Sequence, residues 1–111
     1  GAGVDAATVD AYVKRAVGRI TDAGTVEALT RLKRMGARGR IELRLTIRPD
    51  GGIGELVQRT SSGNAEIDAA TLALVRAAAP FEAYPQALRG SFQGIEIPLT
   101  FDFDRLAAGP G

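Results

Sequence analysis

The chain has 111 residues, of which 45% are hydrophobic and 24% are charged, and its net charge is +1. This length fits one domain with a single core, and the composition is that of a folded protein, which excludes a disordered chain. The absence of Cys and His excludes thiol nucleophiles, imidazole bases, disulfides and zinc sites with the usual ligands.

The N-terminal third carries a helical pattern. One apolar stripe at helical spacing consists of Val9, Val13, Ala16, Val17 and Ile20. A short helix is then predicted over Thr25–Met35, with Gly36 as a left-handed stop. Its expected buried face consists of Val26, Leu29 and Leu32. Residues 1–35 are thus expected to be a helical segment of the domain, as either two helices or one kinked helix.

The clearest element runs from Arg40 to Arg48, where polar and apolar residues alternate without a break. The apolar positions, which share one face, are Ile41, Leu43, Leu45 and Ile47. Because the opposite face is charged, we expect a sheet that is covered on one side only. Pro49–Gly52 predicts a turn, and the chain then returns as a strand over Ile53–Thr60, completing a hairpin.

A third helix and a last strand follow the hairpin. The polar break over residues 61–64 leads into the helix, with Asn64 as its predicted N-cap. Pro80 ends this helix, since proline cannot continue the hydrogen-bond ladder. Alternation returns between Phe92 and Phe103 and predicts the last strand.

This order of elements predicts an α+β fold with a three-stranded sheet. A right-handed crossover makes the second and third strands parallel, so the first strand lies between them, antiparallel to both, in the order 2-1-3. The helices then cover one face. Pro98 indicates that the last strand is an edge, because proline is confined to edges and bulges. We expect residues 36–105 to form the core and residues 106–111 to be a flexible tail.

No arrangement of residues predicts catalysis. Asp102 and Asp104 alternate near the end of the last strand and are interpreted as a solvated strand face rather than a catalytic pair. Ser61 and Ser62 have no base near them in sequence. We therefore expect no enzyme activity, no metal site and no cofactor.

A nucleic-acid-binding role has one motif in its favour. Gly36-Ala37-Arg38-Gly39 is a G-x-x-G after a basic helix end, as in KH domains. That loop should join two helices, whereas here a strand begins at Arg40, so the glycines are better interpreted as a helix stop and a strand start. The row of Arg40, Arg44 and Arg48 has no interleaved aromatic residue. We expect no nucleic-acid partner.

The edge formed by Gly94–Phe101 has two interpretations. Pro98 and the neighbouring acids could protect it against aggregation. Alternatively, its unpaired backbone groups could bind an extended peptide as an additional strand, with side-chain pockets giving specificity. The pattern of residues favours neither interpretation over the other.

An ordered set of short motifs distinguishes the sequence further. The set consists of Gly39-x-Ile41-x-Leu43-x-Leu45-x-Ile47-x-x-Asp50-Gly51-x-Ile53, Ser61-Ser62-Gly63, Ile67-Asp68-x-Ala70, Ala79-Pro80-Phe81 and Ile95-x-Ile97-Pro98-Leu99-x-Phe101. In this order, the motifs resemble the TonB C-terminal domain family over about residues 36–103. The fold of that family agrees with the one predicted above.

The resemblance implies a periplasmic domain, cut from a protein that is anchored in the inner membrane and contacts ExbB and ExbD through its N-terminal part. Such a domain binds the TonB box of outer-membrane receptors by strand addition and energises uptake of siderophores, haem or cobalamin. The implied pairing strand consists of Ile95, Glu96, Ile97, Pro98, Leu99, Thr100 and Phe101. The implied structural turns contain Asp50, Gly51, Ser61, Ser62 and Gly63.

The sequence also departs from the family pattern. Many members carry a Tyr-Pro pair shortly before the first strand, where this chain has Ala28-Leu29. The predicted N-terminal helices are reminiscent of the related TolA C-terminal domain, so an envelope-linking role is the alternative. A homodimer formed through the open edge is a further expectation.

Overall fold

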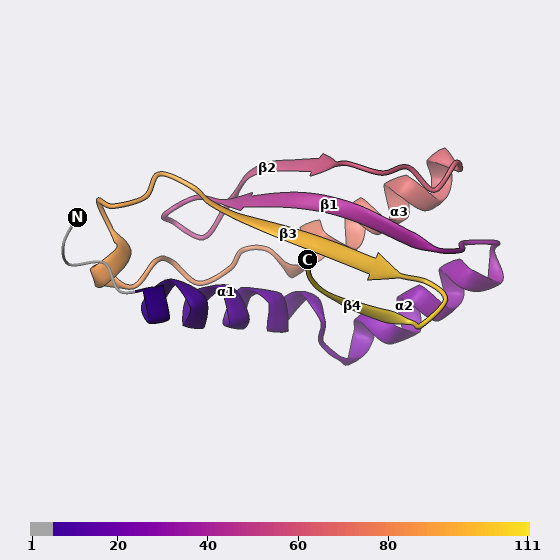
Figure 1. Ribbon diagram of the computed structural model, residues 1–111, viewed down its shortest axis with the longest axis horizontal. Helices are drawn as coiled ribbons and strands as arrows, with labels where there is room; N and C mark the ends of the chain where they lie inside the picture. Colours follow the sequence, from indigo (N-terminus) through magenta and orange to yellow (C-terminus); the bar gives the residue numbers. More distant parts are fainter. Residues whose placement is uncertain (1–5) are drawn as a thin grey trace.

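The computed structural model describes residues 6–111, apart from the side chains of residues 23 and 24. In chain order the elements are α1 (Ala6–Ile20), α2 (Ala23–Arg34), β1 (Arg40–Ile47), β2 (Ile53–Gln58), α3 (Ala65–Ala78), the 3-10 helix η1 (Gln86–Leu88), β3 (Ile95–Asp102) and β4 (Ala107–Pro110) (Figure 1). The N-terminal region therefore forms two helices rather than one kinked helix.

The sheet is antiparallel and has four strands in the order β2-β1-β3-β4. The predicted 2-1-3 arrangement is present within it, with Leu43 of β1 opposite Gln58 of β2 and Leu99 of β3. The expectation of three strands is wrong, because β4 pairs with β3. The expected edge strand is consequently an inner strand over half of its length.

The segment 106–111, predicted as a flexible tail, contains this fourth strand. Leu106 adopts a positive φ of 53° in the turn that reverses the chain after β3. The residues that follow pair with β3, from Asp102 opposite Ala107 to Leu99 opposite Pro110. Their sequence, Ala-Ala-Gly-Pro, has no alternation that could signal a strand. Their pairing depends on the hydrogen-bonding groups that β3 presents.

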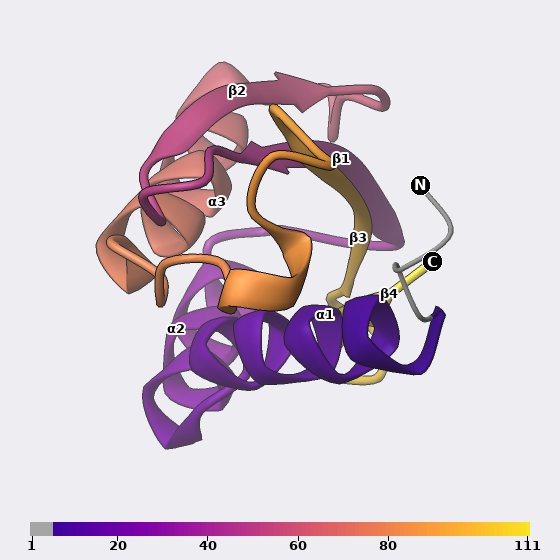
Figure 2. The ribbon, with the colours of Figure 1, turned by 90° about the vertical axis from the view of Figure 1, so that its left-hand side faces the viewer.

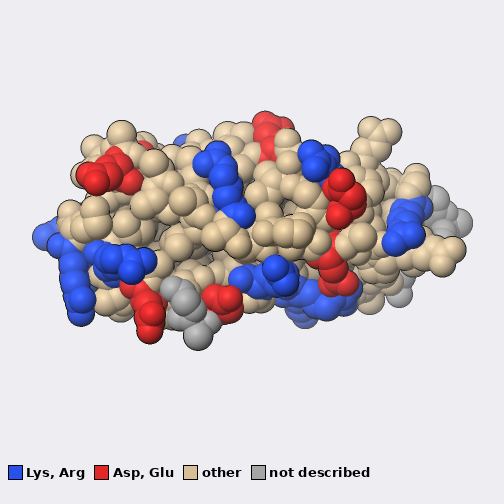
Figure 3. All heavy atoms as spheres, turned by 180° about the vertical axis from the view of Figure 1, so that it is seen from behind, with Lys and Arg blue, Asp and Glu red and all other residues tan. Residues whose placement is uncertain are grey.

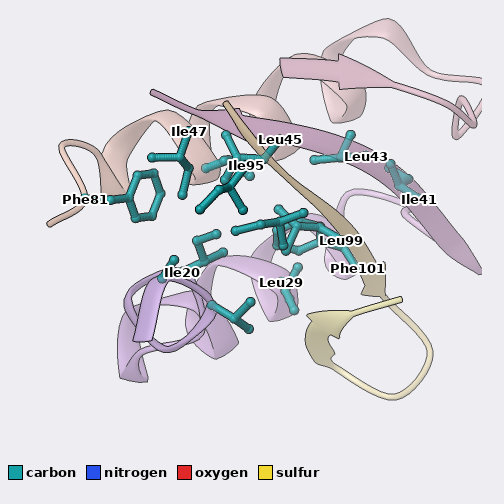
Figure 4. Close-up of a cluster of buried hydrophobic side chains, with 14 of the residues drawn as sticks. Ile20, Leu29, Ile41, Leu43, Leu45, Ile47, Phe81, Ile95, Leu99 and Phe101 are labelled. Carbon is teal, nitrogen blue, oxygen red and sulfur yellow. The ribbon is translucent and has the colours of Figure 1, made fainter. Parts of the chain in front are cut away.

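The helices lie together on one side of the sheet (Figure 2). From the sheet, the core receives Ile41, Leu43, Leu45, Ile47, Ile95, Ile97, Leu99 and Phe101. Figure 4 shows the labelled ones between the sheet and the helices, on the side of Ile20 of α1 and Leu29 of α2. The expected face of α2 is wrong at one position, since Val26 is 49% exposed, whereas Leu29 and Leu32 are buried as predicted.

Two buried tyrosines connect α1 to the loop after α3. The ring of Tyr12 meets the ring of Tyr84 edge to face, with centroids 5.3 Å apart. The Tyr12 hydroxyl donates to the carbonyl oxygen of Glu82 at 2.8 Å, and the Tyr84 hydroxyl donates to that of Ile47. This contact attaches the helical layer to the end of β1. Tyr12 is absent from the stripe predicted for this helix, although its spacing from Ala16 and Ile20 is helical.

Candidate functional site

The candidate site is the outer edge of β3, whose side chains divide cleanly between two faces. Ile95, Ile97, Leu99 and Phe101 are buried beneath the sheet. The alternate side chains lie on the open face, where Glu96 and Pro98 are exposed and Thr100 and Asp102 are half-buried. The buried set attaches the strand to the core and leaves the edge itself available to a partner.

The backbone groups of β3 alternate in the same way between β1 and the outer edge. Phe103 N–H donates toward β1, to the carbonyl oxygen of Gly39 at 2.8 Å, whereas the Pro98 carbonyl accepts from Gly111 N–H on the outer side at 3.1 Å. Because successive residues direct these groups to opposite sides, Glu96, Pro98 and Thr100 face outward. The N–H that Pro98 lacks would have faced outward, so the proline costs no hydrogen bond to β1.

β4 covers the C-terminal half of this edge. Thr100 lies opposite Gly109 and Asp102 lies opposite Ala107, and the Thr100 hydroxyl donates to the carbonyl oxygen of Gly111 at 2.7 Å. Within residues 6–111, no strand pairs with the outer edge of β3 over residues 95–97. The predicted pairing strand is therefore half open and half occupied by the chain itself.

The turn before β4 is held by the two aspartates that sequence analysis had considered as a carboxylate pair. Asp102 Oδ1 accepts from the N–H groups of Asp104 and Arg105, each at 3.0 Å. Asp104 Oδ2 accepts from Gly39 N–H at 3.2 Å. Both carboxylates thus bind backbone donors around the end of β3 and have a structural explanation.

Asp50 and Gly51 lie in the hairpin turn between β1 and β2. Asp50 Oδ1 accepts from Gly52 N–H at 2.9 Å, and this bond, assisted by the Arg48 guanidinium, lowers the pKa of the carboxyl. Gly51 has a φ of +90° and accepts a hydrogen bond from Phe81 N–H at 2.8 Å. Its missing side chain lets the loop after α3 approach closely.

Ser61 and Ser62 bind one carboxylate at the start of α3. The Ser61 hydroxyl donates to Asp68 Oδ2 and the Ser62 hydroxyl to Asp68 Oδ1, both at 2.6 Å. These two bonds, together with the Ser62 N–H, lower the pKa of Asp68 well below its usual range. Gly63 follows with a φ of +86°. Asp68 belongs to one of the motifs quoted above, but its spacing from the two serines does not by itself predict this role.

The predicted N-cap of α3 is confirmed, since the Asn64 side chain accepts from the N–H groups of Glu66 and Ile67.

The G-x-x-G segment joins α2 to β1 rather than two helices. Gly36 and Gly39 have φ values of +109° and +69°, as a helix stop and a strand start require. On the side where α2 and α3 lie, basic and acidic side chains are interspersed (Figure 3).

Among residues 6–111, no helix is long and apolar enough to cross a bilayer, and no group of acidic side chains has the arrangement of a metal site.

A family model described as Gram-negative bacterial TonB protein C-terminal matches residues 30–103. The comparisons with curated proteins and with solved structures gave no match. The matched region begins within α2 and ends just after β3, before the residues of β4.

Proposed function

Because the chain belongs to the TonB C-terminal family, we propose that it is the receptor-binding domain of a periplasmic energy transducer. In this proposal the domain binds the TonB box, a short extended segment of an outer-membrane receptor, along β3. The rest of the transducer is anchored in the inner membrane and contacts ExbB and ExbD. Force transmitted through the domain then opens the receptor to siderophores, haem or cobalamin.

The observation that supports this proposal is the outward backbone of β3. Glu96 and Thr100 direct N–H and carbonyl groups to the outer edge, and Pro98 directs a carbonyl there. An extended peptide of almost any sequence can pair with such groups, while the side chains on the open face select among peptides. The buried Ile97 and Leu99 hold the strand in place.

β4 has to leave before a receptor segment can pair along the whole of β3. Its pairing with residues 99–102 involves few hydrogen bonds, each with a net contribution of about 0.5–1.5 kcal/mol. An incoming strand replaces those bonds and adds bonds along residues 95–97. The exchange is therefore favourable when the partner strand is longer than β4, and the covered edge is protected from aggregation in the meantime.

Strand addition also suits a mechanical task. When two paired strands are pulled in opposite directions along their length, their hydrogen bonds carry the load together, whereas pulling from one end breaks the bonds singly. A receptor segment paired along β3 is loaded through several bonds at once. The strand itself is held from the other side by β1, which pairs with it over its full length.

The experiment that tests this function is a titration of the isotope-labelled domain with a TonB-box-like peptide, followed through backbone amide shifts. We expect shifts clustered at residues 95–101 and signals of released chain from residues 107–111. A peptide of the same length with proline at the alternate positions whose N–H groups would face β3 serves as the control, because it lacks the donors that pair with the edge. Shifts confined to other surfaces would overturn the proposal.

The TolA-like alternative is supported by the two helices that precede the sheet. Ala28 and Leu29, which occupy the place of the family's Tyr-Pro pair, are buried in α2 and cannot contact a receptor. If a well-folded sample binds no box peptide, an envelope-linking role replaces receptor energisation as the better proposal.

A further inference from the structure

The second edge of the sheet, formed by β2, is open along its length. No other strand of residues 6–111 pairs with its outer side, and Figure 1 shows it as the outermost strand above β1. In contrast to β3, it contains no proline, which is a common protection of an exposed edge. The edge is therefore competent to pair with another strand.

The backbone of β2 presents defined groups on that outer side. Arg59 N–H donates to the carbonyl oxygen of Glu42 in β1 at 2.7 Å. By alternation, Val57 and Glu55 also direct their backbone groups toward β1. Leu56 and Gln58 consequently direct their N–H and carbonyl groups outward, where a further strand would bind them.

On the open face of this edge, the side chains of one copy of the chain are complementary to the same side chains of a second, antiparallel copy. Val57 is 41% exposed and lies between Glu55 and Arg59, each two residues away. Neither charged side chain forms an ion pair or hydrogen bond with the described part of the chain. An apolar residue flanked symmetrically by opposite charges is the pattern that an antiparallel self-pair requires.

We propose that β2 pairs with β2 of a second copy of this chain, antiparallel and with the two-fold axis at Val57. In this register Leu56 of one copy lies opposite Gln58 of the other, so that their outward backbone groups exchange hydrogen bonds. Glu55 lies opposite the other copy's Arg59 on both sides of the axis. The two sheets become one continuous sheet.

This interface leaves β3 and β4 at the far edges of the joined sheet, so that both copies can bind a partner strand there. The homodimer expected from the sequence would use the last strand, where β4 covers half of the edge. A pair of single strands buries less surface than stable dimers of about 1,200–2,000 Å² do. The association is accordingly weak and concentration-dependent.

Charge reversal provides a self-contained test. Glu55→Arg or Arg59→Glu alone places like charges opposite each other twice, and we expect each variant to associate about tenfold more weakly or worse. The double variant restores opposite charges and should associate as the original chain does. An equimolar mixture of the two single variants should form a heterodimer, because each supplies the charge that the other lacks.

Sedimentation velocity over a range of concentrations measures the association, and amide shifts on dilution locate it. We expect the shifts at Leu56 and Gln58, and thermal unfolding should be similar for all variants because both side chains are exposed. A chain that stays monomeric at millimolar concentration would overturn the proposal. Concentration-dependent shifts at Glu96–Thr100 instead would place the dimer on the β3 edge and equally overturn it.

Discussion

The Thr100 hydroxyl donates a 2.7 Å hydrogen bond to the Gly111 carbonyl oxygen, which lies opposite the N–H that Pro98 lacks. Gly111 N–H meanwhile donates to the Pro98 carbonyl at 3.1 Å. A side chain thus supplies the donor that is missing from the ladder between β3 and β4. This side-chain hydrogen bond extends the pairing of β4 with β3 as far as Pro98.

Weakening β4 should increase the affinity for a receptor segment. Gly109→Pro removes the N–H opposite Thr100 at a cost of about 1 kcal/mol to β4 pairing, so we expect several-fold tighter binding of a box peptide by calorimetry. Gly109→Ala is the matched control, since a Cβ at this position meets nothing within 4 Å and the N–H remains. Equal affinities of the two variants would show that β4 does not compete for the edge.

Removing an outward donor from β3 should weaken the same binding. Glu96→Pro deletes an N–H on the part of the outer edge that β4 leaves open and keeps the β1 ladder intact, because Ile95 and Ile97 direct their groups toward β1. We expect a loss of about 1 kcal/mol in peptide binding with retained folding by circular dichroism. Glu96→Gln keeps the N–H and serves as the control. Undiminished binding by a folded Glu96→Pro variant would contradict the assigned edge.

Acid should destabilise the domain through Asp68. Hydrogen bonds from Ser61 and Ser62 hold the pKa of Asp68 below its ordinary value of 3.8, so the folded state releases this proton more readily than the unfolded state. The stabilisation is complete above pH 4 or so and is lost as the pH falls through the folded-state pKa. Urea unfolding across this range should show a smaller acid loss in Asp68→Asn, which is less stable at neutral pH. Identical pH profiles would exclude this carboxylate as the cause.

Alkali should destabilise the domain through its two buried tyrosines. Burial, with the neighbouring Tyr84 and Glu82, raises the pKa of Tyr12 to about 12. Since the unfolded side chain ionises near pH 10, the contribution to folding is complete below that pH and is lost as the pH rises through 12. Because burial raises the pKa of both tyrosines, we expect less tyrosinate absorbance near pH 10 from the folded protein than from the unfolded one. The free energy of unfolding of Tyr12→Phe should be about 1 kcal/mol lower at neutral pH, and it should fall less in alkali.

Two glycines with similar positive φ values should respond differently to alanine. At Gly51 an added Cβ would lie 2.1 Å from the carbonyl oxygen of Phe81, whereas at Gly63 it would meet nothing within 4 Å. Gly63→Ala should therefore lower the free energy of unfolding only by the cost of holding alanine in the left-handed conformation, roughly 1–2 kcal/mol. We expect Gly51→Ala to cost clearly more in urea unfolding, since the loop after α3 must move. Equal losses would mean that the loop yields without cost.

Elements with a local signal can be recognised from the amino-acid sequence alone. Unbroken alternation defines β1 and most of β3, because only one face of each strand meets the core. Asn64 marks the start of α3 through the donors that it caps, and Gly36 marks the end of α2 through its positive φ. The antiparallel order 2-1-3 followed from a short turn and a helical crossover. The residues of the candidate edge were identifiable for the same reason.

What lies beside that edge becomes apparent only in the folded molecule. Ala107–Pro110 is too short and too uniform to encode a strand, and it becomes one because β3 presents outward groups at matching spacing. The meeting of Tyr12 with Tyr84 likewise joins residues 72 positions apart in the chain. Such pairings depend on where the folded sheet places its free donors and acceptors, and local sequence carries no record of that placement.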